Sequence, residues 1–365
     1  MKLQEIIRAL EEFAPLSLQE SYDNSGLLFG DPAQELRGAL VSLDCTEAVV
    51  EEAIDKKCDL IIAHHPLIFS GLKKITPARN VDRALIKAIR HNIALYAIHT
   101  NLDNVRHGVN AKISERLRLS GTRILAPRSG DLSKLVVFVP VSHAESVRQA
   151  MFRAGAGEIG QYAECSFSNE GTGTFKAGQG TNPFVGQQDV RHEEPEIRLE
   201  VVVPVWRRAM VVSAMTDAHP YEEVAYDLFP MLNQWSGAGS GMIGNLQNPM
   251  PWQDFFEMLK ERMKVKVIRH TQPVRPAIEK VAVCGGSGSF LISAAKSAGA
   301  DVFITADMKY HQFFDAENSL MIADIGHFES EQFTPELIIE ELGRKFPTFA
   351  THFSAVHTNP VQYFY

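Results

Sequence analysis

Asp59-Leu60-Ile61-Ile62-Ala63-His64-His65-Pro66 is an uninterrupted apolar run that ends in two adjacent histidines. The run predicts a buried strand, and open α/β sheets build their sites beyond the carboxyl ends of such strands. Neutral imidazoles are common ligands of transition metals, so this position predicts a metal site. Because successive side chains of an extended segment point to opposite faces, we expect His64 and His65 to hold two different ions. The alternative is one structural histidine beside a chance neighbour.

A second strand-like run, residues 93–98, leads directly into His99-Thr100-Asn101-Leu102-Asp103. Polar side chains again follow an apolar strand, which is where functional loops concentrate. Asp103 is the candidate metal ligand in this segment.

A third run, residues 319–326, leads into His327 and Glu331, which are spaced i,i+4. On a helix this spacing puts a histidine and a carboxylate on one face, within reach of one ion. Thr334-Pro335 is typical of a helix start, so the alternative is that residues 327–331 form only a short turn before it.

Residues 301–311 repeat the pattern of residues 59–65, with an acidic residue, three apolar residues and then polar chemistry. The repetition indicates an internal duplication, in which two similar α/β halves face a common cleft. The first half predicts a helix at 46–57, a strand at 60–63, a helix at 82–91 and a strand at 94–98. The second predicts a helix at 290–297, a strand at 302–305, a short helix near Tyr310 and a strand at 320–323.

The segment between the halves has a different character. Residues 134–228 predict the order β-α-β-β-α-β of the ferredoxin-like motif, including a helix at 143–152 and strands at 197–203 and 221–228. A turn is predicted at 169–173, a mobile loop at 176–196, and a glycine-rich hinge at 236–241. The predicted fold is therefore an α/β main domain interrupted by an inserted ferredoxin-like α+β domain. The expected boundaries are 1–128 and 237–365 for the main domain and 129–236 for the insert.

Composition narrows the class of function. The 365 residues are 45% hydrophobic and 22% charged, as in ordinary globular proteins. The formal net charge is -8 and no basic patch is evident, so nucleic acid is not an expected partner. The N-terminal residues resemble an amphipathic helix rather than a signal peptide, and no apolar run is long enough to cross a membrane, so we expect a cytoplasmic protein. The four cysteines form no CxxC pair, which favours reduced thiols over disulfides.

Several motifs together resemble the GTP cyclohydrolase I type 2 family, the Nif-three-like dinuclear metal proteins. They are Tyr22-Asp23-Asn24-Ser25-Gly26-Leu27-Leu28, Ala63-His64-His65-Pro66, His99-Thr100-Asn101-Leu102-Asp103, Asp307-Met308-Lys309-Tyr310-His311, Gly326-His327-Phe328-Glu329-Ser330-Glu331 and Thr358-Asn359-Pro360. The similarity spans nearly the whole chain. It implies a homohexameric toroid with two divalent metals per subunit in an α/β cleft. It also implies an insert similar to CutA and PII-type signalling proteins.

The resemblance implies particular roles for individual residues. The metal ligands would be His64, His65, Asp103, His327 and Glu331, with Glu331 as the bridge. A bridging carboxylate suits two dications held ~3.5–4 Å apart.

The remaining motif residues would line the cleft. Asp307 and His311 are the candidate catalytic residues, and His99 would orient a ligand or water. The family usually has Thr-Gly-Asp where this chain has Thr305-Ala306-Asp307, which puts the pocket shape in doubt rather than metal binding.

Two loops leave alternatives open. Residues 285–289 follow an expected strand at 281–283, and they either cradle an anion through their amides or form a plain strand-to-helix turn. Asp23-Asn24-Ser25-Gly26 is either a substrate loop or an Asx turn.

Two classes of function follow. The first is a metal-dependent hydrolase acting on a small molecule, with GTP ring opening and formate release as the reaction that the family name implies. His311 is then the candidate proton donor, or alternatively a histidine that holds the Asp307 turn. The second class is a metal-binding or regulatory scaffold whose insert senses a small ligand. Nitrogen and oxygen ligands suit zinc, iron, manganese and cobalt alike, so the metal stays open.

Overall fold

The computed structural model describes residues 1–364, which divide into two compact units. The first unit contains residues 1–127 together with the residues from 237 onward, and the second contains residues 128–236. Among the described residues, none of the helices has both the length and the apolar character needed to cross a membrane.

The first unit contains a five-stranded sheet that is parallel apart from one edge strand. Its order is β1 (Gly26–Phe29), β4 (Ala94–Ala97), β3 (Leu60–Ala63), β2 (Gly38–Ser42) and β15 (Ala350–Phe353), with β1 antiparallel to β4.

The second sheet of this unit has six strands, three of which, β12, β13 and β14, are parallel. Its order is β11 (Arg269–His270), β14 (Met321–Asp324), β13 (Val302–Ala306), β12 (Ala277–Ser287), β10 (Gln234–Pro251) and β5 (Ser120–Ser129). The strands predicted from the repeated pattern all occur, within one residue of their expected bounds.

Helices cover the faces of both sheets. They are α1 (Leu3–Phe13), α2 (Glu47–Asp55), α3 (Asn80–Arg90), α4 (Thr100–Asn104), α5 (Val109–Arg116), α8 (Trp252–Met263), α9 (Ile292–Ser297), α10 (His327–Glu331) and α11 (Thr334–Lys345). Thr46 caps α2 by accepting a hydrogen bond from the Val49 amide, and Pro335 occupies the first turn of α11.

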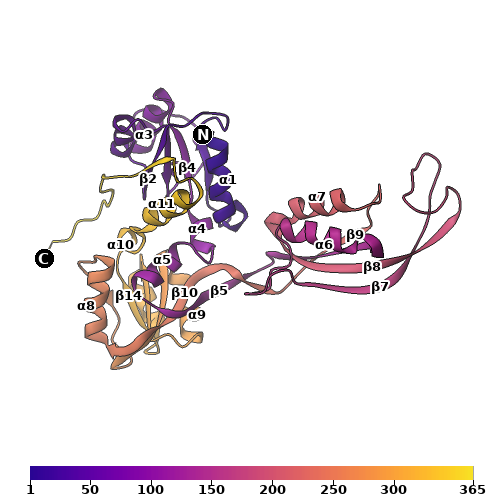
Figure 1. Cartoon of the computed structure of the whole chain (residues 1–365). Coiled ribbons are helices and arrows are strands. Elements are labelled where there is room, and N and C mark those ends of the chain that lie inside the picture. Colours follow the sequence, from indigo (N-terminus) through magenta and orange to yellow (C-terminus); the bar gives the residue numbers. More distant parts are fainter. Residues whose placement is uncertain (365) are drawn as a thin grey trace. The chain divides into compact units, whose positions relative to one another are not determined.

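Strand β3 shows how the core is divided between layers. Leu60 and Ile62 pack into a cluster that includes residues of α1 and α11, whereas Ile61 and Ala63 pack with residues of α2 and α3. Figure 1 shows α1 and α3 on opposite sides of the first sheet. Because both faces of β3 are buried, its sequence is continuously apolar instead of alternating.

The second unit has the element order β-α-β-β-α-β. Its members are β6 (Leu132–Pro140), α6 (Ala144–Arg153), β7 (Ser166–Lys176), β8 (Arg191–Pro204), α7 (Arg208–Ala218) and β9 (Tyr226–Pro230). The sheet order is β7-β8-β6-β9, with antiparallel neighbours throughout. Helices α6 and α7 cover one face of this sheet (Figure 1). This is the order predicted from the sequence.

Three predictions inside this region are wrong. The turn expected at 169–173 lies within β7, where Gly171 pairs with Glu196 across the hairpin. The loop is correspondingly shorter than expected, residues 177–190, because β7 and β8 continue into the predicted loop. The strand expected from Tyr221 begins only at Tyr226. Pairing across a long hairpin has overridden the local turn preference of Asn and Gly.

The chain returns to the first unit at the glycine-rich segment 236–241, but the hinge predicted there is wrong, because these residues belong to strand β10. A Cβ atom at Gly239 would lie 2.3 Å from the Ala126 carbonyl oxygen. Glycine is therefore needed there for close approach of two backbone segments rather than for flexibility.

Candidate metal centre

Polar side chains gather beyond the carboxyl ends of several parallel strands of the first unit. His64 and His65 follow β3, and His99 follows β4 directly before the short helix α4, which carries Asp103. Strand β14 leads into α10, which begins at His327. Strands β3 and β4 are parallel neighbours and end at a common edge of the first sheet. The residues that follow β14 of the second sheet meet the residues at this edge.

The structure brings the five predicted ligands together in two groups that share one residue. One group is His64, Asp103 and Glu331, the other is His65, His327 and Glu331, and within each group the potential ligand atoms lie within 4.8 Å of one another. The i,i+4 pair on α10 therefore faces one site, as its spacing predicts.

A single carboxylate oxygen lies at the centre of the cluster. Glu331 Oε2 is 3.0 Å from His65 Nε2, 3.1 Å from His327 Nε2 and 3.9 Å from His64 Nε2. His64 Nε2 is also 3.7 Å from Asp103 Oδ1. The two groups therefore meet at Glu331, as two neighbouring ion sites with one shared ligand would.

Each of the three histidines is held through its other ring nitrogen. His64 Nδ1 donates to the Ile98 carbonyl oxygen at 2.8 Å. His65 Nδ1 donates to Asp44 Oδ1 at 2.8 Å, and His327 Nδ1 donates to Asp307 Oδ2 at 2.7 Å. These bonds direct each Nε2 toward Glu331 Oε2. Histidines that bind metals are typically held in this way through their other ring nitrogen.

Two buried polar atoms test whether these residues fit a metal. No described residue offers a hydrogen bond to His64 Nε2 or Asp103 Oδ1, although both atoms are buried. Burial, together with the nearby Glu331 charge, raises the pKa of Asp103. Buried polar atoms without partners are costly in folded proteins unless something else binds them. An imidazole nitrogen and a carboxylate oxygen facing each other fit a divalent ion.

Electrostatics within the cluster depend on the shared carboxylate. Burial lowers the pKa of His64 to about 4. Burial would also lower the pKa of His65, but its bonds with Asp44 and Glu331 raise it to about 10. The pKa of His327 rises against burial to about 9, mainly through Glu331. Burial would raise the pKa of Glu331, yet the histidines around it hold that pKa well below its usual value. The protonated forms of His65 and His327 and the ionised form of Glu331 therefore stabilise one another.

The two candidate catalytic residues lie in different surroundings. Asp307, with a left-handed φ of 55°, accepts the His327 hydrogen bond and so orients a candidate ligand. His311 is exposed in the 3₁₀ helix Tyr310–Ala316, where its ring contacts Tyr310 and Phe314. His311 is absent from the described residues that line the adjoining cleft, and its catalytic role stays a prediction.

Sequence reasoning missed Asp44 and understated Asp23. Asp44 binds His65 and also accepts from Thr358 Oγ1 at 2.5 Å. Asp23 accepts from His99 Nδ1 at 2.7 Å and from the Thr100 amide at 3.0 Å. The available signal for Asp44 was its place just after the apolar strand β2, the same pattern that identified the histidines. Asp23 does not form the Asx turn offered as an alternative, because the Ser25 amide donates to Gln19 Oε1 instead; Asp23 positions His99.

The glycine-rich end of strand β12 packs against the cluster. The Gly285 amide donates to Asn110 Oδ1 and the Gly286 amide donates to Ser330 Oγ, so two of its amides are already bound within the protein. A Cβ atom at Gly286 would lie 2.4 Å from Glu331 Oε1. These contacts argue against an anion cradle, and the expected strand at 281–283 extends to Ser287, so the passage from strand to helix begins only there.

A cavity of about 730 Å³ opens beside the cluster. Its wall includes His65, His99 and His327 together with Asp44, Asp307, Asp324, Glu329, Arg269, Phe69, Phe328 and Tyr363. Arg269 is already paired with Asp324. This volume is within the range of small-molecule sites.

Comparison with known proteins now identifies the family. The profile described as Duf34/NIF3 (NGG1p interacting factor 3) matches residues 1–360. The chain belongs to this family. The resemblance inferred from the motifs is confirmed.

Its relatives in the family match over nearly their whole length. The chain is 40% identical over 364 residues to a Halalkalibacterium halodurans protein named GTP cyclohydrolase 1 type 2 homolog, covering 98% of this chain and 97% of that protein. A Bacillus subtilis protein with the same name is 42% identical over 327 residues, which cover 89% of this chain and 88% of that protein. The crystal structure of a Bacillus cereus protein related to NIF3 matches with a TM-score of 0.88 and 40% identity, covering 100% of this chain and 99% of the other.

Proposed function

We propose that the first unit holds two divalent metal ions and hydrolyses a small molecule in the adjoining cleft. The observation that carries this proposal is the position of Glu331 Oε2 between His65, His327 and His64, beside two buried atoms without hydrogen-bond partners. A pair of such ions would supply Lewis acidity and lower the pKa of a coordinated water.

The protein itself supplies position and charge. Five side chains would hold the ions: His64, His65, Asp103, His327 and Glu331. Asp44, Asp307 and the Ile98 carbonyl group fix the three imidazoles. Of these contacts, the buried one between His64 and Ile98 is strengthened most by its surroundings.

GTP is one candidate substrate, because relatives at 40% and 42% identity carry the name GTP cyclohydrolase 1 type 2 homolog. The reaction would open the imidazole ring of guanine and release formate. Asp307 lies in the cleft wall. His311, which lies outside that wall in the 3₁₀ helix Tyr310–Ala316, would be the proton donor. Loss of about 10²-fold or more in turnover, with both ions still bound, is the result expected of His311→Ala.

A second candidate function is a homohexameric metal-binding scaffold that is regulated through the inserted module. The observation that favours it is a separate cavity of about 560 Å³ formed wholly by the second unit. A CutA/PII-like ligand-sensing role for this module is part of the same proposal.

The first experiment measures metal content. The protein is purified without added metal, its metals are quantified, and the wild type is compared with Glu331→Gln. The variant should lose most of both ions, because a neutral amide cannot serve two cations as a shared anion. Glu336→Gln on α11 makes the same change of charge outside the cluster and should keep them. Full occupancy in Glu331→Gln would refute the shared site.

The second experiment measures turnover. Metal-replete wild type is incubated with a panel of nucleotides, and formate is quantified. Formate released from GTP, abolished by chelation and restored by metal, would support the hydrolase. No release from any nucleotide by a protein with two bound ions would favour the scaffold.

A further inference from the structure

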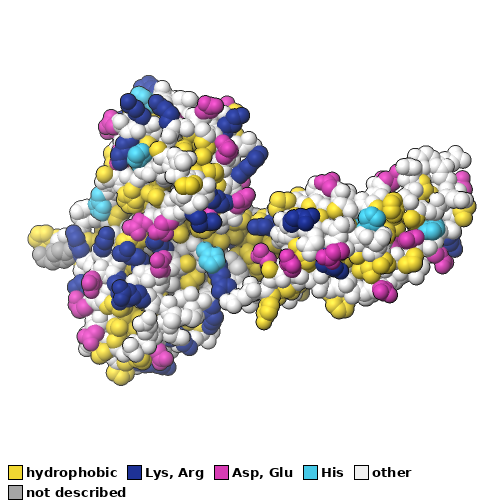
Figure 2. All heavy atoms as spheres, viewed as in Figure 1, with side chains coloured by type: hydrophobic (Ala, Val, Ile, Leu, Met, Phe, Trp, Pro, Cys, Tyr) yellow, Lys and Arg dark blue, Asp and Glu magenta, His cyan; other side chains and the backbone are white. Residues whose placement is uncertain are grey.

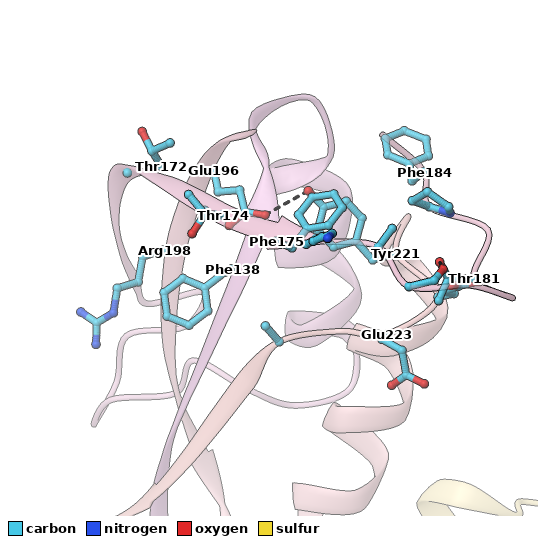
Figure 3. Close-up of a pocket in the computed structure, with 18 of the residues that line it drawn as sticks. Phe138, Thr172, Thr174, Phe175, Thr181, Phe184, Glu196, Arg198, Tyr221 and Glu223 are labelled. Atoms are coloured by element: carbon cyan, nitrogen blue, oxygen red, sulfur yellow. Dashed lines mark hydrogen bonds between the residues drawn. The ribbon is translucent and has the colours of Figure 1, made fainter. Parts of the chain in front are cut away.

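The second unit contains its own cavity, remote in sequence from the metal-binding residues. It lies between strands β6, β7 and β8, the loop 177–190 and the turn before β9 (Figure 3). Its volume of about 560 Å³ falls within the range of small-ligand sites. All of its lining residues belong to the unit formed by residues 128–236.

One side of this cavity is aromatic. The rings of Phe175 and Tyr221 are 6.2 Å apart between centroids, and those of Phe184 and Tyr221 are 6.3 Å apart. Phe184 is 51% exposed, and Phe138 adds a further ring to the lining. The wall therefore offers apolar surface and several ring faces to a ligand.

A nearly buried carboxylate lies against this aromatic wall. Glu196 is 9% exposed, and its Oε1 accepts the Tyr221 hydroxyl hydrogen bond at 3.0 Å. Figure 3 shows the carboxylate pointing toward Tyr221, with Phe175 beside them. A Cβ atom at Gly173 would lie 2.1 Å from Glu196 Oε2, so the carboxylate occupies space that only glycine leaves open.

Within the described part of the chain, no basic side chain forms an ion pair with Glu196. The two basic residues of the cavity wall have other acidic partners: Arg198 pairs with Glu200, and Lys176 lies 4.0 Å from Asp189. A buried carboxylate with one neutral donor and no cation is costly unless a positive charge reaches it.

Two more acids add to the negative charge of the wall, Glu222 and Glu223. On the face shown in Figure 2, acidic and hydrophobic side chains adjoin each other over this unit. The wall is therefore apolar and electronegative, which disfavours a phosphate or carboxylate ligand.

We propose that this cavity binds a small organic cation, an amine or quaternary ammonium attached to an apolar or aromatic group. The cationic nitrogen would meet the Glu196 carboxylate, and the apolar group would pack on Phe175, Phe184 and Tyr221. Ammonium groups bind carboxylates by charge-assisted hydrogen bonds and bind aromatic faces by cation–π attraction. This proposal does not depend on the metal centre.

The test uses three probes of similar size that differ in charge. Phenethylammonium, phenethyl alcohol and hydrocinnamate are titrated into the full-length protein by isothermal calorimetry. We expect phenethylammonium to bind at least about tenfold more tightly than the alcohol, and hydrocinnamate to bind most weakly.

Two variants of the cavity wall and one control variant locate the site. Glu196→Gln preserves size and the acceptor for Tyr221, and it should weaken phenethylammonium binding by about tenfold while leaving the alcohol unchanged. Glu193→Gln removes the same charge from an exposed position of β8 outside the cavity wall and should bind like the wild type. Phe184→Ala, in an exposed loop, should weaken both probes and tests the cavity even if Glu196→Gln does not fold.

Three results would overturn the proposal. The first is no preference for the cation over the alcohol in the wild type, which includes no binding of either probe. The second is undiminished cation binding by both folded cavity variants. The third is a change of oligomeric state in Phe184→Ala by sedimentation without any amine binding, which would assign the aromatic wall to contact with a second copy of the chain.

Discussion

Replacing Gly286 with alanine should damage metal binding far more than it damages folding. Gly286 is buried and has a φ of 61°, so alanine there costs roughly 1–2 kcal/mol in backbone strain. The new Cβ atom would lie 2.4 Å from Glu331 Oε1, where an ordinary contact begins at 3.4 Å. The carboxylate must therefore retreat by about 1 Å, whereas metal–ligand distances tolerate only about ±0.2 Å.

A matched control separates strain from displacement. Gly299 has a φ of 71°, and the nearest atom to its Cβ position is Lys280 Nζ at 3.8 Å. Gly299→Ala should thus carry a similar backbone strain without touching the cluster. Each variant should melt some degrees below the wild type in the metal-free state, at roughly 2–4 °C per kcal/mol.

Metal affinity distinguishes the two variants. In competition with a chromogenic chelator, Gly286→Ala should bind Zn²⁺ about 10-fold to 100-fold more weakly than the wild type. Gly299→Ala should bind Zn²⁺ as tightly as the wild type. Equal affinities in the two variants would show that Glu331 does not need its present position, and the shared-ligand reasoning would fail.

Three further predictions follow from the same geometry. Asp44→Ala should lower Zn²⁺ affinity by about 10-fold to 100-fold because His65 loses the acceptor that fixes its ring, and an unchanged chelator titration would contradict this. Zn²⁺ binding at pH 8 should release up to two protons per chain, because the pKa values of His65 and His327 without metal are about 10 and about 9. Zn²⁺ affinity should therefore fall as pH falls. An indicator dye that records no proton release on Zn²⁺ binding would refute this prediction. Replacing residues 128–236 with a short Gly/Ser linker should leave a core that melts cooperatively and binds metal, because Gly239 and Ala126 lie in close contact near the two cut ends. A metal-free or insoluble product would show that the second unit is structurally required.

Much of the candidate metal centre could be predicted from sequence because its signals are local. The apolar run 60–63 predicts a strand by its composition, and the histidines that follow it must lie at the strand's end. The i,i+4 spacing of His327 and Glu331 likewise puts both on one face wherever the helix lies. The order β-α-β-β-α-β of the second unit follows from the same periodicities, together with the spacing of its elements.

Other features were beyond local reasoning, because they depend on which segments meet. The glycines at 236–241 resemble a hinge in sequence, and only their pairing within β10 makes them strand residues. His311 follows Asp307 by four positions, yet it lies exposed in a 3₁₀ helix while Asp307 binds His327.

The sequence by itself determined the α/β class, the family and the chemistry at the strand ends, since these depend on residue type and on short-range spacing. Only the tertiary structure decided that Glu331 contacts His65 across 266 positions, that Asp44 orients that histidine, and that Glu196 lies buried without a cation. The physical reason is that hydrogen bonds and burial depend on separations of a few ångströms in space. Positions along the chain do not set those separations until the sheets have packed.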